Sequence, residues 1–262
     1  MQQTESFNRL KDARYGKMLY NVHDAYVGRS IEMYGEYSQL ETTVFEQLAR
    51  PGSVVIDVGA NIGVHTLFFA KSVGPTGIVL AFEPQRIVFQ TLCANMALNS
   101  ITNAHCYRVG LADQAGSLRT PPVNYAADNN FAGLPLGDFE GGEVVEVNRL
   151  DHFSLPACQL IKIDAVGMEL QVLQGASGLI DKFKPVLYVA NERPQNSDAL
   201  VRHIDSLGYK MYAHRPALYN PDNFLRNPTN VFGNVISMNL LCFHSSTPHN
   251  IQGLPAVEPP QE

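Results

Sequence analysis

The sequence predicts an α/β fold built on a mostly parallel sheet with helices on both faces, and three observations lead there. Short β-branched runs such as 53–58 (SVVIDV) and 77–82 (GIVLAF) are typical of strands buried on both faces. Segments with apolar residues at helical spacing follow most of these runs. Apolar residues make up 45% of the 262 residues, which is enough for one sizeable core. Strands that alternate with helices pair in parallel.

The elements can be placed in order along the chain. Pro84 suits the first turn of a helix, Ser197 can cap another, and Gly208 can end it. Strands are predicted at 53–58, 77–82, 104–111, 160–163, 185–191, 209–214 and 234–243, with short ones near 117–120 and 143–149. Helices are predicted at 61–72, from 84 onward, after 164, and from 197 to 207. No helix separates the last two main strands, which predicts an antiparallel pair at one edge of the sheet.

The chain ends look different from the middle. Residues 1–15 are polar and mixed in charge, and we expect them to be flexible. Residues 245–262 are Pro-rich and aperiodic, and we expect a disordered tail. Residues 16–244 then form one domain. The N-terminus has no apolar core typical of a signal peptide, and no apolar run approaches the roughly 20 residues of a membrane span. We therefore expect a soluble, cytoplasmic protein without a membrane partner.

Charge and cysteine content narrow the classes of partner. Lys and Arg number 19 against 25 Asp and Glu, so the net charge is −6, and no basic cluster occurs. A nucleic-acid partner is therefore not expected. The four cysteines lie far apart and form no C-x-x-C pair, which predicts neither a zinc site nor a disulfide framework. We predict no metal site.

The loop after the first strand, "DVGANIGVHT", has the features of a cofactor site. Gly59 permits a tight turn, and Gly63 permits close approach at the start of the next helix, whose amide groups can face a ligand. Glu83 ends the second strand 20 residues after Gly63, where a carboxylate can hold ribose hydroxyls. Asn61 replaces the second glycine of the dinucleotide pattern G-x-G-x-x-G, which argues against a nicotinamide-dependent oxidoreductase. The pattern D-x-G-x-x-x-G fits S-adenosylmethionine (SAM) better.

Several stretches resemble the FkbM family of SAM-dependent methyltransferases over roughly residues 14–243. They are "MYGEYSQLE", "VVIDVGANIGVHTLFFA", "AFEPQRIVFQTLCANMALN", "NNFAG", "IKIDAVGMELQVLQGA", "VLYVANERPQNSDAL" and "NVFGNVISMNLLC". The resemblance implies a Rossmann-like class I methyltransferase fold with a seven-stranded sheet. It also implies methyl transfer from SAM, typically to a hydroxyl of a sugar, a polyketide or another small metabolite.

The resemblance also assigns cofactor-binding positions. Glu83, followed by Pro84, would hold the ribose of SAM, and Asp164 would lie near its methyl group. Glu36 and Glu41 match the segment that opens into the cofactor site, although a solvated helix face explains them equally well. The methionine and sugar side of SAM would be lined by Asp57, Gly59, Ala60, Asn61 and Gly63.

Two departures from the family pattern concern the reaction itself. Val166 and Ala190 stand where related sequences carry glutamates. Neither side chain can accept a proton, and a general base is worth roughly 10²–10⁴-fold in rate. The leading hypothesis is an O-methyltransferase acting on a small hydroxylated acceptor. The alternative is a SAM-binding homologue with weak or no catalysis.

Three other side chains are candidate catalytic groups. Asp164 follows the fourth main strand, Glu192 the fifth, and His214 ends the next. A carboxylate at position 164 can equally cap the following helix, and His214 can equally be structural. We expect residues 113–157 and 215–233 to shape the acceptor pocket, because long loops at such sheets carry function.

Overall fold

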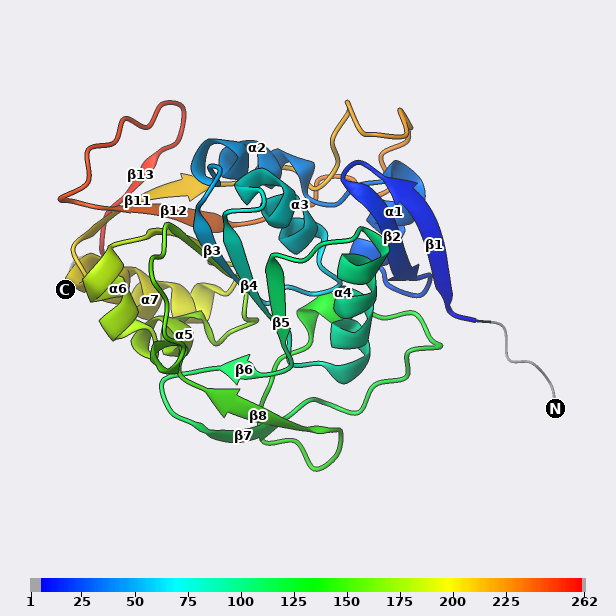
Figure 1. Cartoon of the computed structure of the whole chain (residues 1–262), viewed down its shortest axis with the longest axis horizontal. Coiled ribbons are helices and arrows are strands. Elements are labelled where there is room, and N and C mark those ends of the chain that lie inside the picture. The colour runs from blue at the N-terminus through cyan, green and yellow to red at the C-terminus, as the bar shows by residue number, and fades with distance from the viewer. Residues whose placement is uncertain (1–5, 261–262) are drawn as a thin grey trace.

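Eight strands form the central sheet: β3 (Val54–Val58), β4 (Ile78–Phe82), β5 (Ala104–Tyr107), β9 (Leu160–Ile163), β10 (Val186–Ala190), β11 (Tyr209–His214), β12 (Asn239–His244) and β13 (Ala256–Val257). Their order is β13-β11-β12-β10-β9-β3-β4-β5 (Figure 1). The computed structural model describes residues 6–260. Strands β5, β4, β3, β9 and β10 pair in parallel. The mostly parallel sheet is therefore confirmed, with eight strands where the family resemblance implies seven. Two of them run antiparallel to their neighbours: β12, which lies between β10 and β11, and β13 at the edge.

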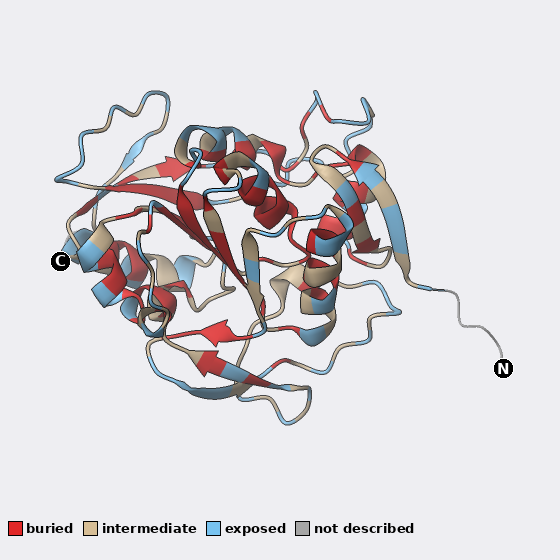
Figure 2. Ribbon diagram, in the orientation of Figure 1, coloured by how far each residue is buried: buried red, intermediate tan, exposed pale blue. Residues whose placement is uncertain are grey.

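Helices cover both faces of this sheet: α1 (Val27–Tyr34), α2 (Gln39–Leu48), α3 (Val64–Val73), α4 (Arg86–Leu98), α5 (Glu169–Gln174), α6 (Ser177–Phe183) and α7 (Pro194–Ser206). Helices α5, α6 and α7 pack against Ile56, Ile161 and Leu187 on one face. Helices α2 and α3 pack against Val55 and Val79 on the other. The central strands are buried on both faces (Figure 2), as their β-branched sequences predict. No helix within residues 6–260 has the length and apolar character needed to cross a membrane.

The helix that follows the cofactor loop, α3, begins later than predicted. Residues 61–72 were expected to be helical, but α3 starts at Val64. Asn61 has a φ of 51° and Gly63 a φ of 88°, so the chain passes through two left-handed positions before the helix. Gly63 also faces Leu92, whose Cδ1 would lie 2.5 Å from an added Cβ. The loop therefore takes three residues that periodicity alone assigns to the helix.

The expectation of a flexible N-terminus is wrong for the described part of residues 1–15. Strands β1 (Asn8–Ala13) and β2 (Gly16–Asn21) form an antiparallel hairpin. The fully buried Asn95 of α4 holds the hairpin, because its side chain accepts from Leu19 N (2.6 Å) and donates to Leu19 O (3.0 Å). Residues 1–5 lie outside the described part. The polar, mixed-charge sequence does not predict this hairpin, because the side chain that holds it, Asn95, lies far along the chain.

The prediction of a disordered C-terminal tail is also wrong where the tail is described. Strand β13 pairs with β11 and becomes the antiparallel edge of the sheet. The imidazole of His249 stacks on Phe243, with ring centroids 4.7 Å apart.

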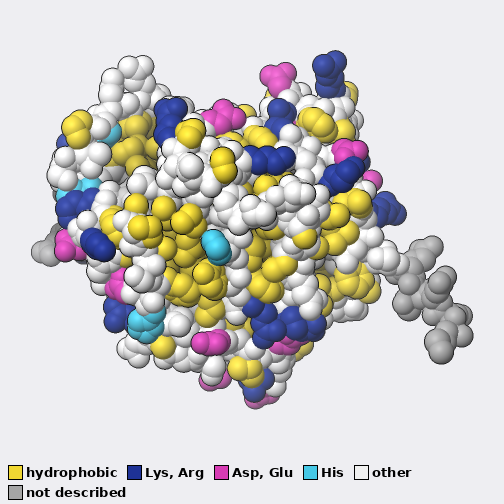
Figure 3. All heavy atoms as spheres, in the orientation of Figure 1, with side chains coloured by type: hydrophobic (Ala, Val, Ile, Leu, Met, Phe, Trp, Pro, Cys, Tyr) yellow, Lys and Arg dark blue, Asp and Glu magenta, His cyan; other side chains and the backbone are white. Residues whose placement is uncertain are grey.

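The irregular stretch before β9 forms a separate small sheet of β6 (Gly110–Leu111), β8 (Val144–Asn148) and β7 (Gly116–Arg119). Its last two strands confirm the short strands predicted near 117–120 and 143–149. On the face drawn in Figure 3, basic and acidic side chains are interspersed.

Candidate active site

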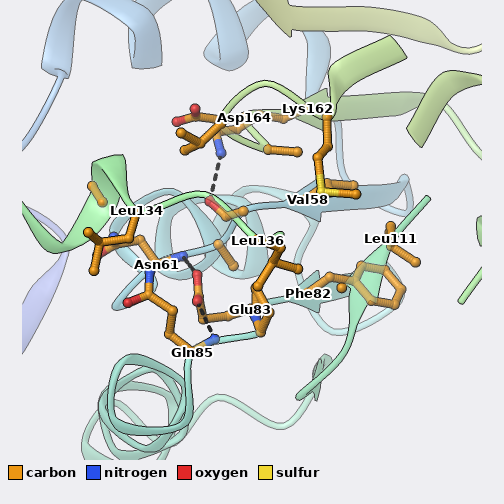
Figure 4. A pocket seen from close by; sticks show the side chains of 18 of the residues that line it. Val58, Asn61, Phe82, Glu83, Gln85, Leu111, Leu134, Leu136, Lys162 and Asp164 are labelled. Carbon is orange, nitrogen blue, oxygen red and sulfur yellow. Dashed lines mark hydrogen bonds between the residues drawn. The ribbon is translucent and has the colours of Figure 1, made fainter. Parts of the chain in front are cut away.

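A cavity, here called the first cavity, opens where the carboxyl ends of β3, β4 and β9 meet (Figure 4). This is the edge of a parallel sheet where ligands bind. One side of the cavity is polar and carries Asn61, Glu83 and Asp164. Apolar side chains line the rest, among them Val58, Phe82, Val109, Leu111, Leu134 and Leu136. The cavity therefore combines an apolar slot with a few placed polar groups, as cofactor sites do.

Gly59 allows the ends of β3 and β9 to come together. It has a φ of 71°, and an added Cβ would lie 1.8 Å from the carbonyl oxygen of Asp164. The Asp164 N–H donates to Val58 O at 3.0 Å, which ties the two strand ends (Figure 4). A side chain at position 59 would separate them, so the glycine brings Asp164 beside the cofactor loop.

The carboxylate of Glu83 is fixed by two backbone amides. Asn61 N–H donates to Oε2 at 3.0 Å, and Gln85 N–H donates to Oε1 at 2.8 Å (Figure 4). Burial raises the pKa of Glu83 to about 7, although both amides act in the opposite direction. Each oxygen keeps a free lone pair that can accept from a ligand hydroxyl. Glu83 thus presents a rigid acceptor to the cavity.

Asp57 lies beneath the cofactor loop and does not line the first cavity. Its Oδ1 accepts from Lys162 Nζ at 2.9 Å, and its Oδ2 accepts from Thr66 Oγ1 at 2.7 Å. Lys162 also donates to the carbonyl of Gly59 at 3.3 Å. Both charged side chains are buried, so the pair braces the loop from below. Lys162 therefore pairs with an acid on the neighbouring strand β3.

A second cavity continues from the first beside the carboxyl ends of β10 and the start of β12. Tyr37, His65, Lys162 and Asp164 line both cavities and mark their junction. The Asp164 carboxylate is exposed to this space. Burial raises the pKa of Asp164 to about 7 and Lys162 acts in the opposite direction, while Glu192 and Glu41 add to the rise.

The predicted site residues separate into three sets. The first cavity is lined by Gly59, Ala60, Asn61, Glu83, Pro84 and Asp164, and the second by Glu41, Asp164 and Glu192. Neither cavity is lined by Glu36, Asp57, Gly63 or His214. Glu36 instead pairs with Arg14 (2.6 Å) and accepts from Asn220 (2.9 Å). His214 Nδ1 is bonded to the Tyr188 hydroxyl at 2.8 Å, which supports the structural alternative for this histidine.

Sequence reasoning missed several cavity residues. Leu134 and Leu136 come from the 113–157 region, but they line the first cavity and not a separate acceptor pocket. Nothing in 215–233 lines either cavity. Gln85 was also missed: its Nε2 donates to Phe131 O at 2.8 Å, and its buried Oε1 has no partner. The position of Gln85, two residues after Glu83, is the sequence feature that could have identified it as a cavity residue.

Val166 and Ala190, where the family resemblance implies glutamates, both face the site. Val166 lines the first cavity and Ala190 the second. Val166 also has a φ of 34°, which is unfavourable for a β-branched residue.

Replacing Val166 with asparagine should raise the free energy of unfolding by about 1 kcal/mol, because asparagine tolerates positive φ and the strain costs about 1–3 kcal/mol. Chemical denaturation of both proteins measures the change. The same replacement at Val235, which is exposed and has no positive φ, should bring no gain. A lower stability for Val166→Asn would contradict this explanation.

Comparisons with known proteins agree with the fold and the loop. Methyltransferase sdnD of Sordaria araneosa is 27% identical over 158 residues, covering 46% of this chain and 59% of that protein. Hexuronic acid methyltransferase AglP of Haloferax volcanii is 26% identical over 166 residues, covering 62% and 64%. The 31-O-demethyl-FK506 methyltransferase FkbM of Streptomyces tacrolimicus is 41% identical over 70 residues, covering 27% and 26%. The chain thus spans less than two thirds of the length of these relatives.

A solved structure supports the fold class. The FkbM methyltransferase from Methylobacillus flagellatus KT superposes with a TM-score of 0.51 at 21% identity, covering 74% of this chain and 44% of that one. The model of the methyltransferase FkbM domain matches residues 57–211, which is more than half of the chain. This segment runs from the end of β3 to β11 and includes Gly59, Glu83 and Asp164. The chain therefore belongs to the FkbM methyltransferase family.

Proposed function

We propose that this chain is a SAM-dependent O-methyltransferase and that the first cavity binds SAM. The observation that carries the proposal is the Glu83 carboxylate, held by two backbone amides at the polar side of an otherwise apolar slot. A ribose offers two adjacent hydroxyl donors to such an acceptor. SAM carries no phosphate, so it does not need the glycine that Asn61 replaces.

The residues of the cavity fit the parts of SAM in turn. Leu111, Leu134 and Leu136 provide apolar surfaces for an adenine ring. Gln85 Oε1 is free to accept a hydrogen bond, because its amide nitrogen is committed to Phe131. Ala60 and Asn61 lie toward the sugar, and Asp164 toward the positively charged methionine end. When bound, SAM supplies an activated methyl group, and the chain orients the acceptor beside it.

Of the three catalytic candidates, Asp164 and Glu192 are retained in this proposal. Both line the second cavity, where an acceptor hydroxyl can approach the junction. His214 is set aside because it lines neither cavity and its Nδ1 is hydrogen-bonded to the Tyr188 hydroxyl.

The names of the relatives support a small hydroxylated acceptor, since one methylates a hexuronic acid and another an oxygen of FK506. The alternative is a homologue that binds SAM without turnover. Val166 and Ala190 favour it, because they place apolar groups on the cavity walls at the two glutamate positions. Such a protein would bind SAM and transfer no methyl group to any acceptor.

SAM binding should release protons near pH 7 and strengthen as the pH rises. Glu83 and Asp164 both have a pKa of about 7 in the free protein. Ribose hydroxyls and the cationic methionine end favour the charged carboxylates, so binding lowers both pKa values. The affinity should rise up to about tenfold per pH unit and group below pH 7, and level off above pH 8.

Calorimetric titration in two buffers of different ionisation enthalpy measures this proton release. Adenosine, which carries the ribose but lacks the methionine end, should show the Glu83 contribution alone. No SAM binding at millimolar concentration would overturn the proposed function. Binding without any proton release would contradict the role given to the two carboxylates.

A further inference from the structure

The second cavity is built from side chains that sequence reasoning did not bring together. Glu41 comes from α2, His65 from α3, Tyr188 and Ala190 from β10, and Asn239 from β12. These elements meet beyond the junction, on the side of Asp164 away from Glu83. A molecule in this cavity would therefore lie next to the methionine end of SAM and away from its adenine.

Two buried polar atoms of residues lining this cavity have no hydrogen-bond partner within the described part of the chain. They are Nε2 of His65 and Nδ2 of Asn239, and each side chain belongs to a residue that is only 7% exposed. Buried polar groups in proteins are nearly always hydrogen-bonded, because an unmade bond costs free energy. Both residues line this cavity, so a polar ligand there can supply the missing hydrogen bonds.

The cavity is also acidic. Three carboxylates line it, from Glu41, Asp164 and Glu192. Among residues 6–260, Lys162 is the one cation that lines it, and its charge is offset by the ion pair with Asp57 at 2.9 Å. Arg193 also acts on Glu192, although it does not line the cavity. A ligand with its own carboxylate would meet like charge here, whereas hydroxyl or ammonium donors would meet acceptors.

Building on the proposed function, we propose that the second cavity is the acceptor subsite and selects hydroxylated acceptors without a carboxylate, with His65 as the base. The acceptor oxygen forms a bond to the methyl carbon as the bond from that carbon to sulfur breaks. The electron pair of the broken bond stays on sulfur, which becomes a neutral thioether. The hydroxyl proton passes to His65 Nε2 and is later released to water.

The surroundings of His65 suit this role. Its ring lies edge-on to Phe45, with centroids 5.3 Å apart, and 6.1 Å from the ring of Tyr37. Burial lowers the pKa of His65, and Lys162 lowers it further, while Glu41 and Asp57 act in the opposite direction. Lowering of the pKa favours the neutral imidazole, which can accept a proton. It supplies the base that Val166 and Ala190 cannot.

The charge selection can be tested by binding alone. The probes are three methyl glycosides that differ in charge: methyl glucoside, methyl glucosaminide and methyl glucuronide. Each is titrated into the full chain saturated with S-adenosylhomocysteine. We expect the neutral and amino sugars to bind at least tenfold more tightly than the glucuronide. Glu192→Gln should narrow this difference, and Glu140→Gln, an exposed residue outside both cavities, should not. Equal or preferred binding of glucuronide, or binding of none of the three, overturns the proposal.

The role of His65 is tested with His65→Gln and the glycoside that binds best. We expect kcat to fall roughly 10²–10⁴-fold, which exceeds any change in glycoside affinity, while the affinity for S-adenosylhomocysteine stays within threefold. His203→Gln is the matched control, because His203 also has an unpartnered Nε2 but lines neither cavity. A retained kcat, a parallel loss of binding, or a wild type that binds both ligands without transfer overturns this role. Failure of SAM to bind would instead overturn the proposed function itself.

Discussion

Replacing Lys162 with methionine should lower the free energy of unfolding by about 3–5 kcal/mol, the cost of leaving one partner of a buried ion pair without the other. The Lys162 and Asp57 side chains are only 5% and 0% exposed, and their charged atoms lie 2.9 Å apart. Burial alone would lower the pKa of Lys162, but Asp57 and Asp164 reverse the effect and leave it raised. The variant therefore leaves the buried Asp57 carboxylate beneath the cofactor loop without its cation. Urea denaturation followed by circular dichroism measures the loss.

Two further variants give this prediction its controls. Lys17→Met removes the cation of a pair of similar length, Lys17 with Asp12 at 2.7 Å, in which the side chains are 54% and 78% exposed. It should cost only about 0–1 kcal/mol. Adding Asp57→Asn to Lys162→Met should recover much of the lost stability, because no buried charge then remains unpaired. If Lys162→Met costs no more than Lys17→Met, the pair does not brace the loop.

Under the proposed function, replacing Glu83 with glutamine should weaken SAM binding by about 5- to 150-fold. Both carboxylate oxygens of Glu83 accept from backbone amides, at 3.0 and 2.8 Å. Glutamine substitutes an NH₂ group for one oxygen, so two donors face each other and one ribose acceptor is lost. A buried group left without its hydrogen bond costs about 1–3 kcal/mol. Calorimetric titration of SAM gives the change in Kd directly.

The matched control is Glu143→Gln, which removes a carboxylate from the exposed pair with Arg86, at the start of the helix that follows Glu83. The SAM affinity of this variant should stay within about twofold, since exposed ion pairs contribute little. An unchanged Kd for Glu83→Gln would place the ribose elsewhere. Loss of the fold in Glu83→Gln would be visible in the denaturation curve and would separate a binding effect from a stability effect.

Local sequence signals were strong enough to predict the sheet and the cofactor loop. The β-branched runs at 54–58 and 78–82 are buried on both faces, so their composition reports their place directly. Gly59 was predicted from the need for a tight turn, and the nearby carbonyl of Asp164 shows why no side chain fits there. These features depend on residues close together in the chain.

The predictions that failed depend on residues far apart in the chain. Residues 8–13 form a strand because Asn95, on a helix more than seventy residues later, bonds the backbone of the partner strand. Residues 256–257 pair with β11 although their sequence carries no strand pattern. Hydrogen bonds to the backbone from distant residues do not require any pattern of side chains in the segment that they hold, so its sequence does not predict them.

The sequence by itself determined a mostly parallel α/β sheet, the cofactor loop with Glu83 at its rim, and the family. Only the tertiary structure decided which polar groups face a ligand. Asp57 and Glu36 bind internal partners, Lys162 and Arg14. His214 is hydrogen-bonded to Tyr188. His65 and Asn239 line a second cavity. Backbone turns and strand ends follow from local residue types, whereas the partner of a buried charge or imidazole depends on which elements pack beside it.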